Sequence, residues 1–409
     1  ADFYFQILKL NKRRVASIGT LGIKTQNYIR KVSNTTIDPI TLSLVLNKLK
    51  KERINDIILE ASSHGLKQNR LDGLQFKTAI FTNLSHDHLD YHKTFNDYLK
   101  SKLYLFKKLL KKNANIITDI EAPQYIKIKK IALKNKLNIE TISNNKSNLE
   151  IISHEYQNEK QVVKIRYNKN IYKFETRLIG KIQIKNILMA IIAAKKSDLN
   201  FKKIINTVKN LKPVSGRLEQ IGKIKNNSKV ILDYAHTPDA LKTSLKNLKE
   251  QFKNRKILIV FGCGGDRDKE KRPMMGKIAN QYCDKIYLTD DNPRFENPKL
   301  IRNSIKKNIN KSKIYEVSNR ANAINKAILA LKTGDILIVA GKGHEEIQEY
   351  KKSKKLFSDR KQILKNIKIK NKILSSSFKL NILKELSNSG NISSKLTIKN
   401  ASINSKEVK

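Results

Sequence analysis

The sequence has few of the features that mark secreted or membrane proteins. Its only cysteines, Cys263 and Cys283, are too few for a disulfide framework and are not a C-x-x-C pair, so a reducing, cytoplasmic location is expected. No apolar run approaches the roughly 18 residues that a membrane-spanning helix needs. The opening ADFYFQILKLNKRR has no starting methionine and places its charges after the apolar part, the reverse of a secretory signal. We therefore interpret residue 1 as an internal point of a longer chain.

Acidic residues are scarce beside basic ones. The chain holds 84 Lys and Arg against 36 Asp and Glu, which gives a formal net charge of +48. Such an excess indicates a nucleic-acid partner when it is gathered on one element. Here the lysines are spread over almost every segment, and neither an aromatic RNA-binding strand nor a zinc knuckle accompanies them. We expect no nucleic-acid partner, and we keep a basic nucleic-acid-binding α/β protein as an alternative.

Short apolar runs alternate with lysine-rich helical patterns as far as residue 365. The runs that we interpret as strands are 56–60, 78–84, 229–235, 256–262, 285–290 and 335–341. Because they are apolar on both faces and separated by helices, they predict an α/β fold with parallel sheets covered on each side. Residues 145–178 alternate in polarity and predict a small antiparallel insert. The pattern restarts after NLKPVSGR, so we predict domains over 1–212 and 213–365, followed by a polar segment, 366–409, that begins as a linker.

Three glycine-containing loops fail to match phosphate-binding motifs. In SIGTLGIKT (17–25), Ile23 separates the second glycine from Lys24, and the two glycines are too close for G-x-x-x-x-G-K-[ST], so a turn is predicted. In FGCGGDRDKEKRP (261–273), Arg267 occupies the third glycine position of G-x-G-x-x-G, and the charged residues 266–268 suit an anionic or zwitterionic small molecule. VAGKGHE (339–345) also lacks the phosphate-loop spacing.

Two polar segments follow predicted strands, where open parallel sheets place their ligands. Glu60, directly after DIIL, is suited to a hard cation such as Mg²⁺, although Ser62 or Ser63 could instead simply cap a helix. The next segment carries five acidic and histidine residues within a span of seven, and this density predicts a metal or phosphate role; they are His86, Asp87, His88, Asp90 and His92. The zinc-hydrolase pattern H-x-H-x-D-H fails here at Tyr91, and a metal-dependent hydrolase stays as a further alternative.

Ten segments together resemble the Mur ligases of bacterial cell-wall synthesis, in family order. They are NTT (34–36), EASSHGLKQNR, TNLSHDHLDYH, YLKSKLYLF, PVSGRLE, LDYAHTPDAL, FGCGGDRDKEKRP, TDDNPR, AGKGHE and SDR. Within the family, the resemblance is to the members that add meso-diaminopimelate to UDP-N-acetylmuramoyl-L-alanyl-D-glutamate. It implies a central ATPase domain and a Rossmann-like C-terminal ligase domain, with ATP and Mg²⁺ as cofactors. It also implies a reaction in which ATP converts a substrate carboxylate to an acyl phosphate, which the incoming amine attacks.

The resemblance also implies the roles of particular residues. The metal ligands are Glu60, His88 and a carbamylated Lys102. The residues for the UDP-muramoyl dipeptide are Asn34, Thr35, Thr36, Ser62, Gln68 and Arg70. Those for ATP are Asn186, Arg217, Asp233 and His236. Those for diaminopimelate are Arg267, Asp291, Asn292, Pro293, Arg294, Gly341 and Glu345.

The chain departs from the family pattern in three places. The family's phosphate loop, G-T-N-G-K-T, precedes a helix like ADFYFQILKL, so we expect it upstream of Ala1 and expect residues 1–409 alone not to turn over ATP. The family's G-x-F-N-x-x-N near adenine has Gln183 in the first asparagine position and keeps Asn186. The tail resembles the start of the ligase that adds D-alanyl-D-alanine, with Asn404 in place of an aspartate. That likeness suggests a fused second ligase, and a disordered lysine-rich tail is the alternative.

Overall fold

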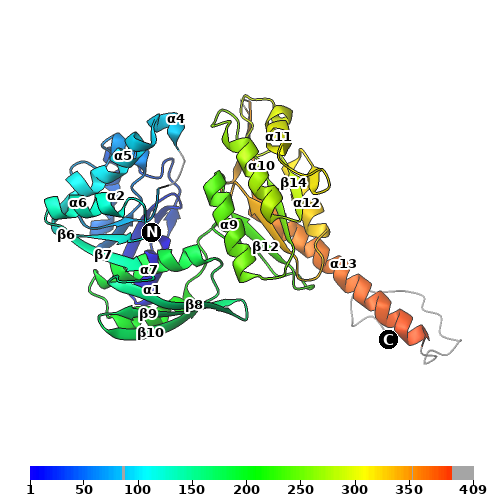
Figure 1. The fold of residues 1–409 in the computed structure, drawn as a ribbon, viewed down its shortest axis with the longest axis horizontal. Coiled ribbons are helices and arrows are strands. Elements are labelled where there is room, and N and C mark those ends of the chain that lie inside the picture. Colours follow the sequence, from blue (N-terminus) through cyan, green and yellow to red (C-terminus); the bar gives the residue numbers. More distant parts are fainter. Residues whose placement is uncertain (85–87, 352, 389–409) are drawn as a thin grey trace. The chain divides into compact units, whose positions relative to one another are not determined.

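A computed structural model describes residues 1–84, 88–351 and 353–388 (Figure 1). These form two compact units. The first unit holds Ala1–Leu218 and Lys242–Lys253, and the second holds Glu219–Leu241 and the chain from Asn254 onward. Helix α9 (Pro238–Gln251) therefore begins in the second unit and continues in the first. His86, Asp87 and Asn404 lie outside the described residues.

A small mixed sheet with strand order β3-β2-β1-β4 opens the first unit. Its strands are β1 (Val15–Gly19), β2 (Gly22–Lys24), β3 (Ile29–Arg30) and β4 (Asp56–Leu59). The helices around it are α1 (Asp2–Leu10), α2 (Pro39–Lys51) and α3 (Ser63–Lys67). Strand β1 runs parallel to β4 and forms an antiparallel hairpin with β2, so SIGTLG is a hairpin turn, closed by Gly22 at φ +96°.

A second sheet of the first unit has the order β10-β9-β8-β7-β6-β5. Its strands are β5 (Phe76–Phe81), β6 (Leu110–Asp119), β7 (Asn138–Ser143), β8 (Leu149–Gln157), β9 (Lys160–Tyr167) and β10 (Asn170–Thr176). The helices are α4 (Leu89–His92), α5 (Phe95–Lys108), α6 (Tyr125–Lys134), α7 (Lys181–Lys195), α8 (Phe201–Thr207) and the 3₁₀ turn η1 (Val208–Asn210). Strands β5 to β8 pair in parallel, whereas β8, β9 and β10 are antiparallel. The predicted antiparallel insert is confirmed.

Helix α7 supplies much of the core of the first unit. Nearly every residue from Ile187 to Ala194 is buried, and α7 packs against α1. A helix that is apolar all round is expected to lie in a core, because no face of it suits water.

The second unit contains a sheet with the order β11-β12-β16-β13-β14-β15, which is parallel except for the antiparallel edge strand β11. The strands are β11 (Glu219–Gln220), β12 (Lys229–Asp233), β13 (Ile257–Phe261), β14 (Lys285–Leu288), β15 (Ile314–Glu316) and β16 (Ile336–Ala340). The helices α10 (Lys271–Tyr282), α11 (Pro298–Lys306) and α12 (Arg320–Leu329) connect them. The predicted parallel α/β fold is confirmed, and the carboxyl ends of β12, β13, β14 and β16 meet at one edge.

The chain then forms the hairpin of β17 (Ile347–Tyr350) and β18 (Ser353–Leu356), followed by the long helix α13 (Asp359–Asn388, Figure 1). Residues 366–377, which we expected to begin as a linker, are instead helical, and α13 continues to Asn388. The reason is tertiary packing, because Ile363, Asn366 and Ile367 are buried, and Asn325 of α12 donates to Asn366 Oδ1 at 2.5 Å. In the part of the chain that the structure describes, no helix is both long and apolar enough to cross a bilayer.

Candidate active site

Glu60 lies against the turn between β1 and β2 in the first unit. Its Oε2 accepts hydrogen bonds from the backbone N–H of Thr20 at 2.9 Å and from the Thr20 hydroxyl at 2.7 Å. A Cβ at Gly19 would stand 2.5 Å from Glu60 Cδ, so a larger residue there would displace the carboxylate from this position. The SIGTLG loop, whose spacing does not match a phosphate-binding loop, therefore fixes the position of Glu60.

A hydrogen-bonded network joins several of the residues that the resemblance implies for the dipeptide substrate. The Thr36 hydroxyl donates to Glu60 O at 2.8 Å and accepts from Ser62 N at 2.8 Å, and Arg70 Nη1 donates to Thr36 O at 2.7 Å. The Ser62 hydroxyl in turn accepts from Gly65 N at 3.0 Å and caps α3. The helix-cap interpretation is thus correct for Ser62 and is compatible with a role for Glu60, since both follow β4.

The remaining implied substrate residues lie at or near the margin of this network. Thr35 shares a 3.1 Å hydroxyl contact with Thr20, whereas Asn34 is exposed. Gln68 is also exposed and donates to the Tyr91 hydroxyl at 3.0 Å. The structure therefore brings Thr35, Thr36, Ser62 and Arg70 close to Glu60, and leaves the side chain of Asn34 at the surface.

His88 and Lys102 both lie against the ring of Tyr98. The ring centroids of His88 and Tyr98 are 5.8 Å apart, and Lys102 Nζ stands 5.2 Å from the Tyr98 centroid. Lys102 also donates to Asn83 O at 3.4 Å, at the end of the β5 segment. Among the described residues, no group of three His, Cys, Asp or Glu side chains could hold a metal ion.

His92, which we included in the predicted metal or phosphate cluster, is fully buried. Its Nε2 lies 2.9 Å from the Ser63 hydroxyl, and its ring stacks on Tyr98 with centroids 5.1 Å apart. Burial lowers the pKa of His92, and the Asp97 carboxylate, 3.7 Å from Nδ1, opposes that shift. A neutral ring that packs α3 against α5 explains this residue better than a ligand role.

The residues implied for ATP divide between the two units. In the first unit, Asn186 and Gln183 share one face of α7, and Asn186 Nδ2 lies 3.5 Å from Gln183 Oε1. Gln183 also reaches the backbone carbonyl of Arg217 at 3.5 Å. In the second unit, Asp233 ends β12 and His236 Nδ1 lies 2.8 Å from Tyr234 O.

Two loops of the second unit are in direct backbone contact at the carboxyl edge of its sheet. Gly265 N donates to Asn292 O at 2.9 Å, and a Cβ at Gly265 would come within 1.8 Å of Pro293 O. At Gly262, a Cβ would come within 2.2 Å of Thr289 O. Glycine is therefore required in FGCGG because the backbone of TDDNPR lies directly against it.

Arg294 is held in place from two sides. Its Nη1 donates to Gly265 O at 2.7 Å, and its Nε donates to Glu349 Oε2 of β17 at 3.1 Å. Its backbone has φ +52°, an uncommon conformation for a residue with a side chain, and backbone hydrogen bonds to Glu349 O and from Lys351 N fix it there. Glu296, two residues further along, binds Arg272 instead, at 2.8 and 2.9 Å.

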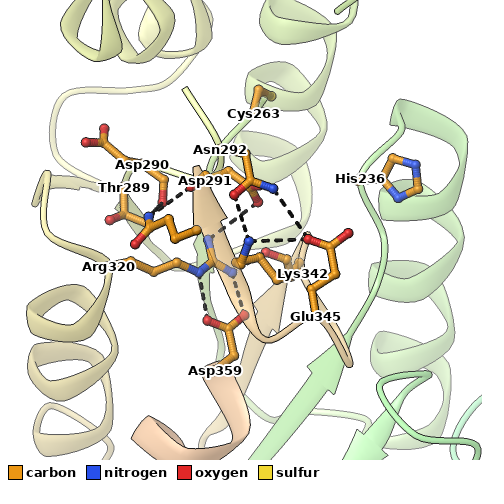
Figure 2. Close-up of polar contacts among 12 residues, drawn as sticks. His236, Cys263, Thr289, Asp290, Asp291, Asn292, Arg320, Lys342, Glu345 and Asp359 are labelled. Carbon is orange, nitrogen blue, oxygen red and sulfur yellow. Dashed lines mark hydrogen bonds and ion pairs between the residues drawn. The ribbon is translucent and has the colours of Figure 1, made fainter. Parts of the chain in front are cut away.

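Asn292 and Glu345 meet around the ammonium group of Lys342 (Figure 2). Lys342 is fully buried, and its Nζ lies 2.9 Å from Asn292 Oδ1 and 3.3 Å from Glu345 Oε2. Asn292 Nδ2 also lies 3.4 Å from Glu345 Oε2, and the Tyr234 hydroxyl lies 3.4 Å from Glu345 Oε1. The Glu345 side chain is 36% exposed, so a ligand can reach it.

A buried ion pair contacts Asp291 and the residue before Gly341. Arg320 and Asp359, both fully buried, form two hydrogen bonds of 2.7 Å, and Arg320 also donates to Ala340 O at 2.9 Å (Figure 2). Arg320 Nη1 stands 3.8 Å from Asp291 Oδ2. A Cβ at Gly341 would come within 2.6 Å of Asp291 Oδ2, so the carboxylate lies directly over that glycine. Arg267, in contrast, is exposed on its loop.

Sequence reasoning missed four residues that organise the site: Thr20, Arg320, Lys342 and Glu349. Lys342 lies inside AGKGHE, a segment that we had singled out, but a lysine among so many gave no sign of being buried. The pairing of Glu349 with Arg294 joins residues 55 positions apart and had no local signal.

Comparisons with known proteins identify the family of the chain. The family model of the Mur ligase middle domain matches residues 2–194, and that of the Mur ligase glutamate ligase domain matches residues 216–343. The UDP-N-acetylmuramoyl-L-alanyl-D-glutamate–2,6-diaminopimelate ligase of Rickettsia rickettsii is 38% identical over 376 residues, covering 90% of this chain and 77% of that protein. The ligase of the same name from Rhizobium meliloti is 38% identical over 365 residues, covering 89% and 74%.

Solved structures give the same result for the fold. A structure of a UDP-N-acetylmuramoyl-L-alanyl-D-glutamate–2,6-diaminopimelate ligase superposes with a TM-score of 0.65 at 31% identity, over 90% of this chain and 75% of that chain. A Mycobacterium tuberculosis folylpolyglutamate synthase, solved with ADP, shares the fold at a TM-score of 0.67 and 15% identity, over 83% of this chain and 84% of that chain. These matches extend along nearly the whole described chain, and they show that the protein belongs to the Mur ligase family.

Proposed function

We propose that this protein joins meso-diaminopimelate to UDP-N-acetylmuramoyl-L-alanyl-D-glutamate at the expense of ATP. The names of its relatives support the reaction, and the second unit supplies the observation that carries it. At one edge of the sheet, an arginine fork (Arg294) and a partly exposed carboxylate (Glu345) belong to loops that are linked through Asn292. A zwitterion with a second carboxylate and a second ammonium group is the kind of ligand that this pair of charges suits.

The reaction has two steps. An oxygen of the D-glutamyl carboxylate attacks the γ-phosphorus of ATP, and the bond to ADP breaks. The amine of diaminopimelate then attacks the carbonyl carbon of the acyl phosphate, a C–N bond forms, and phosphate leaves while the amine loses its proton. Catalysis of this type depends mainly on positioning and on neutralising charge.

Glu60, His88 and Lys102 are the residues that we propose to hold Mg²⁺, which would neutralise the phosphate oxygens. Glu60 fits this role because Thr20 binds only its Oε2, and Oε1 has no hydrogen bond to any residue that the structure describes. Lys102 fits only as its carbamate, because an ammonium group would repel the ion. The hydrogen-bonded network of Thr36, Ser62 and Arg70 would position the dipeptide end of the substrate next to Glu60.

In this proposal, Arg294 selects the amino acid that is added. Two of its five N–H groups are used by Glu349 and Gly265. The other three lie on Nη1 and Nη2, which is the edge that binds a carboxylate through paired hydrogen bonds. ATP and a nucleotide-linked precursor as substrates also favour a cytoplasmic site of action.

The test is product formation by the protein as encoded in its gene. Incubation with the UDP-muramoyl dipeptide, ATP, Mg²⁺ and meso-diaminopimelate should yield the tripeptide product, seen by mass spectrometry, with one phosphate released per product. Tight binding of RNA or DNA with a steep salt dependence, and no product, would favour the nucleic-acid alternative. Hydrolysis that depends on bound zinc would favour the hydrolase alternative.

A further inference from the structure

Lys342 is a fully buried cation for which the reaction as described has no use. It follows β16 between two glycines, and none of its side chain is exposed. Removing an ammonium group from water is costly unless charge and hydrogen bonds compensate for it. In the part of the chain that the structure describes, its hydrogen-bond partners are Asn292 and Glu345, both of which we assign to the amino-acid site.

The contact with Asn292 fixes which way its amide group faces. Asn292 Oδ1 accepts hydrogen bonds from Lys342 Nζ at 2.9 Å and from Glu349 N at 3.1 Å. A flipped amide would turn its NH₂ group toward two donors, so only one orientation is favourable. Asn292 Nδ2 is then directed at Glu345 Oε2, 3.4 Å away.

The contact with Glu345 fixes one of its two carboxylate oxygens. Lys342 Nζ and Asn292 Nδ2 both approach Oε2, whereas among the described residues the Tyr234 hydroxyl, at 3.4 Å, is the one hydrogen-bond partner of Oε1. Because the side chain is 36% exposed, Oε1 can accept a hydrogen bond from a ligand without first breaking its contact with Lys342.

We infer that Lys342 is a positioning residue for the amino-acid substrate: it orients the Asn292 amide and holds Glu345 so that Oε1 receives an ammonium group of diaminopimelate. Since it is buried, Lys342 acts through these two side chains and does not touch the substrate. This inference rests on the proposed function, because it assumes that Glu345 binds the amino acid.

The first test is steady-state kinetics of Lys342→Met, which keeps the length of the side chain and removes its charge. We expect the KM for meso-diaminopimelate to rise about ten- to a hundredfold, the scale of a lost charged hydrogen bond. The KM values for ATP and for the UDP-muramoyl dipeptide should change less than about threefold. The matched control is Lys370→Met in the same unit, which loses a 2.7 Å hydrogen bond to Leu329 O on α12 and should leave every KM unchanged.

A double-mutant cycle separates positioning from simple loss of stability. If Lys342 works partly through Glu345, then Lys342→Met should raise the KM for diaminopimelate by a smaller factor in a Glu345→Gln background than in the unmodified enzyme. Full additivity, or a stable Lys342→Met enzyme with an unchanged KM for the amino acid, would overturn the inference. If Lys342→Met does not fold, Lys342→Gln keeps a donor toward Asn292 and takes its place in the cycle.

A crystal structure of the variant gives a readout that does not depend on turnover. In Lys342→Met, or in Lys342→Gln if the former is unfolded, we expect the Glu345 side chain to leave its position beside Asn292. An unmoved Glu345 side chain would refute the inference whatever the enzyme acts on. Failure of the unmodified protein to use diaminopimelate, by contrast, would refute the proposed function alone.

Discussion

Replacing Arg294 should remove the preference for diaminopimelate over lysine. Lysine lacks the distal carboxylate, so it forgoes the paired hydrogen bonds to Nη1 and Nη2. A lost charge-assisted hydrogen bond costs about 1.5 to 3 kcal/mol, which is roughly ten- to a hundredfold in selectivity. Arg294 is not left unpaired when lysine binds, because Glu349 still accepts from Nε at 3.1 Å. The larger cost of an unpaired buried charge, about 3 to 5 kcal/mol, is therefore not expected.

The assay is competition between meso-diaminopimelate and L-lysine, with the ratio of kcat/KM values read from the two products. Arg294→Ala should bring this ratio down by about ten- to a hundredfold, and Arg294→Lys should lie between it and the unmodified enzyme, because an ammonium group keeps the charge but not the planar fork. Arg255→Ala is the matched control, since Arg255 precedes β13 at the opposite edge of the sheet. An unchanged ratio in Arg294→Ala would show that this loop does not recognise the distal carboxylate.

Three further predictions concern the metal site and the supports of the amino-acid site. Lys102→Ala should lose most activity and recover part of it with added short carboxylates, whereas Lys100→Ala should stay active; full activity of Lys102→Ala would make Lys102 a surface lysine. Arg272 holds the pKa of Glu296 below its ordinary value of 4.5, so this pair should stabilise the fold above that pH and lose its effect as the pH falls. The unfolding temperature of Glu296→Gln should therefore fall less between neutral and acid pH than that of the unmodified protein. Asp359→Asn leaves the fully buried Arg320 without its carboxylate and should lower the free energy of unfolding by about 3 to 5 kcal/mol in urea titrations; a loss below 1 kcal/mol would contradict this.

The strands could be predicted because their signals are local. The runs at 229–235, 256–262, 285–290 and 335–341 each correspond to an observed strand of the second unit, since apolar residues on both faces suit a sheet that is covered on both sides. The segment after residue 365, which we expected to begin as a linker, is helical because of tertiary packing. Residues 366–377 look polar and linker-like, yet the buried Asn366 and Ile367 anchor them in a helix.

Residues for the candidate site could be proposed from the sequence, but their contacts could not be predicted. Glu60 was singled out because it directly follows a strand, and Arg294 because its segment resembles the Mur ligases. Their partners Thr20 and Glu349 come from distant segments, and hydrogen bonds between such segments leave no periodic trace in the sequence. For His92 a local signal was misleading. Its place among histidines and aspartates suggested a ligand, whereas packing against Tyr98 buries its ring.

Transfer of ¹⁸O from the substrate to phosphate tests the account most directly. The D-glutamyl carboxylates of the UDP-muramoyl dipeptide would be labelled with ¹⁸O and incubated with the protein as encoded, ATP, Mg²⁺ and meso-diaminopimelate. The account predicts a product that contains diaminopimelate, and one ¹⁸O atom in each phosphate released, because the acyl phosphate leaves with an oxygen of the carboxylate. Phosphate without label, or no product that contains diaminopimelate, would contradict it.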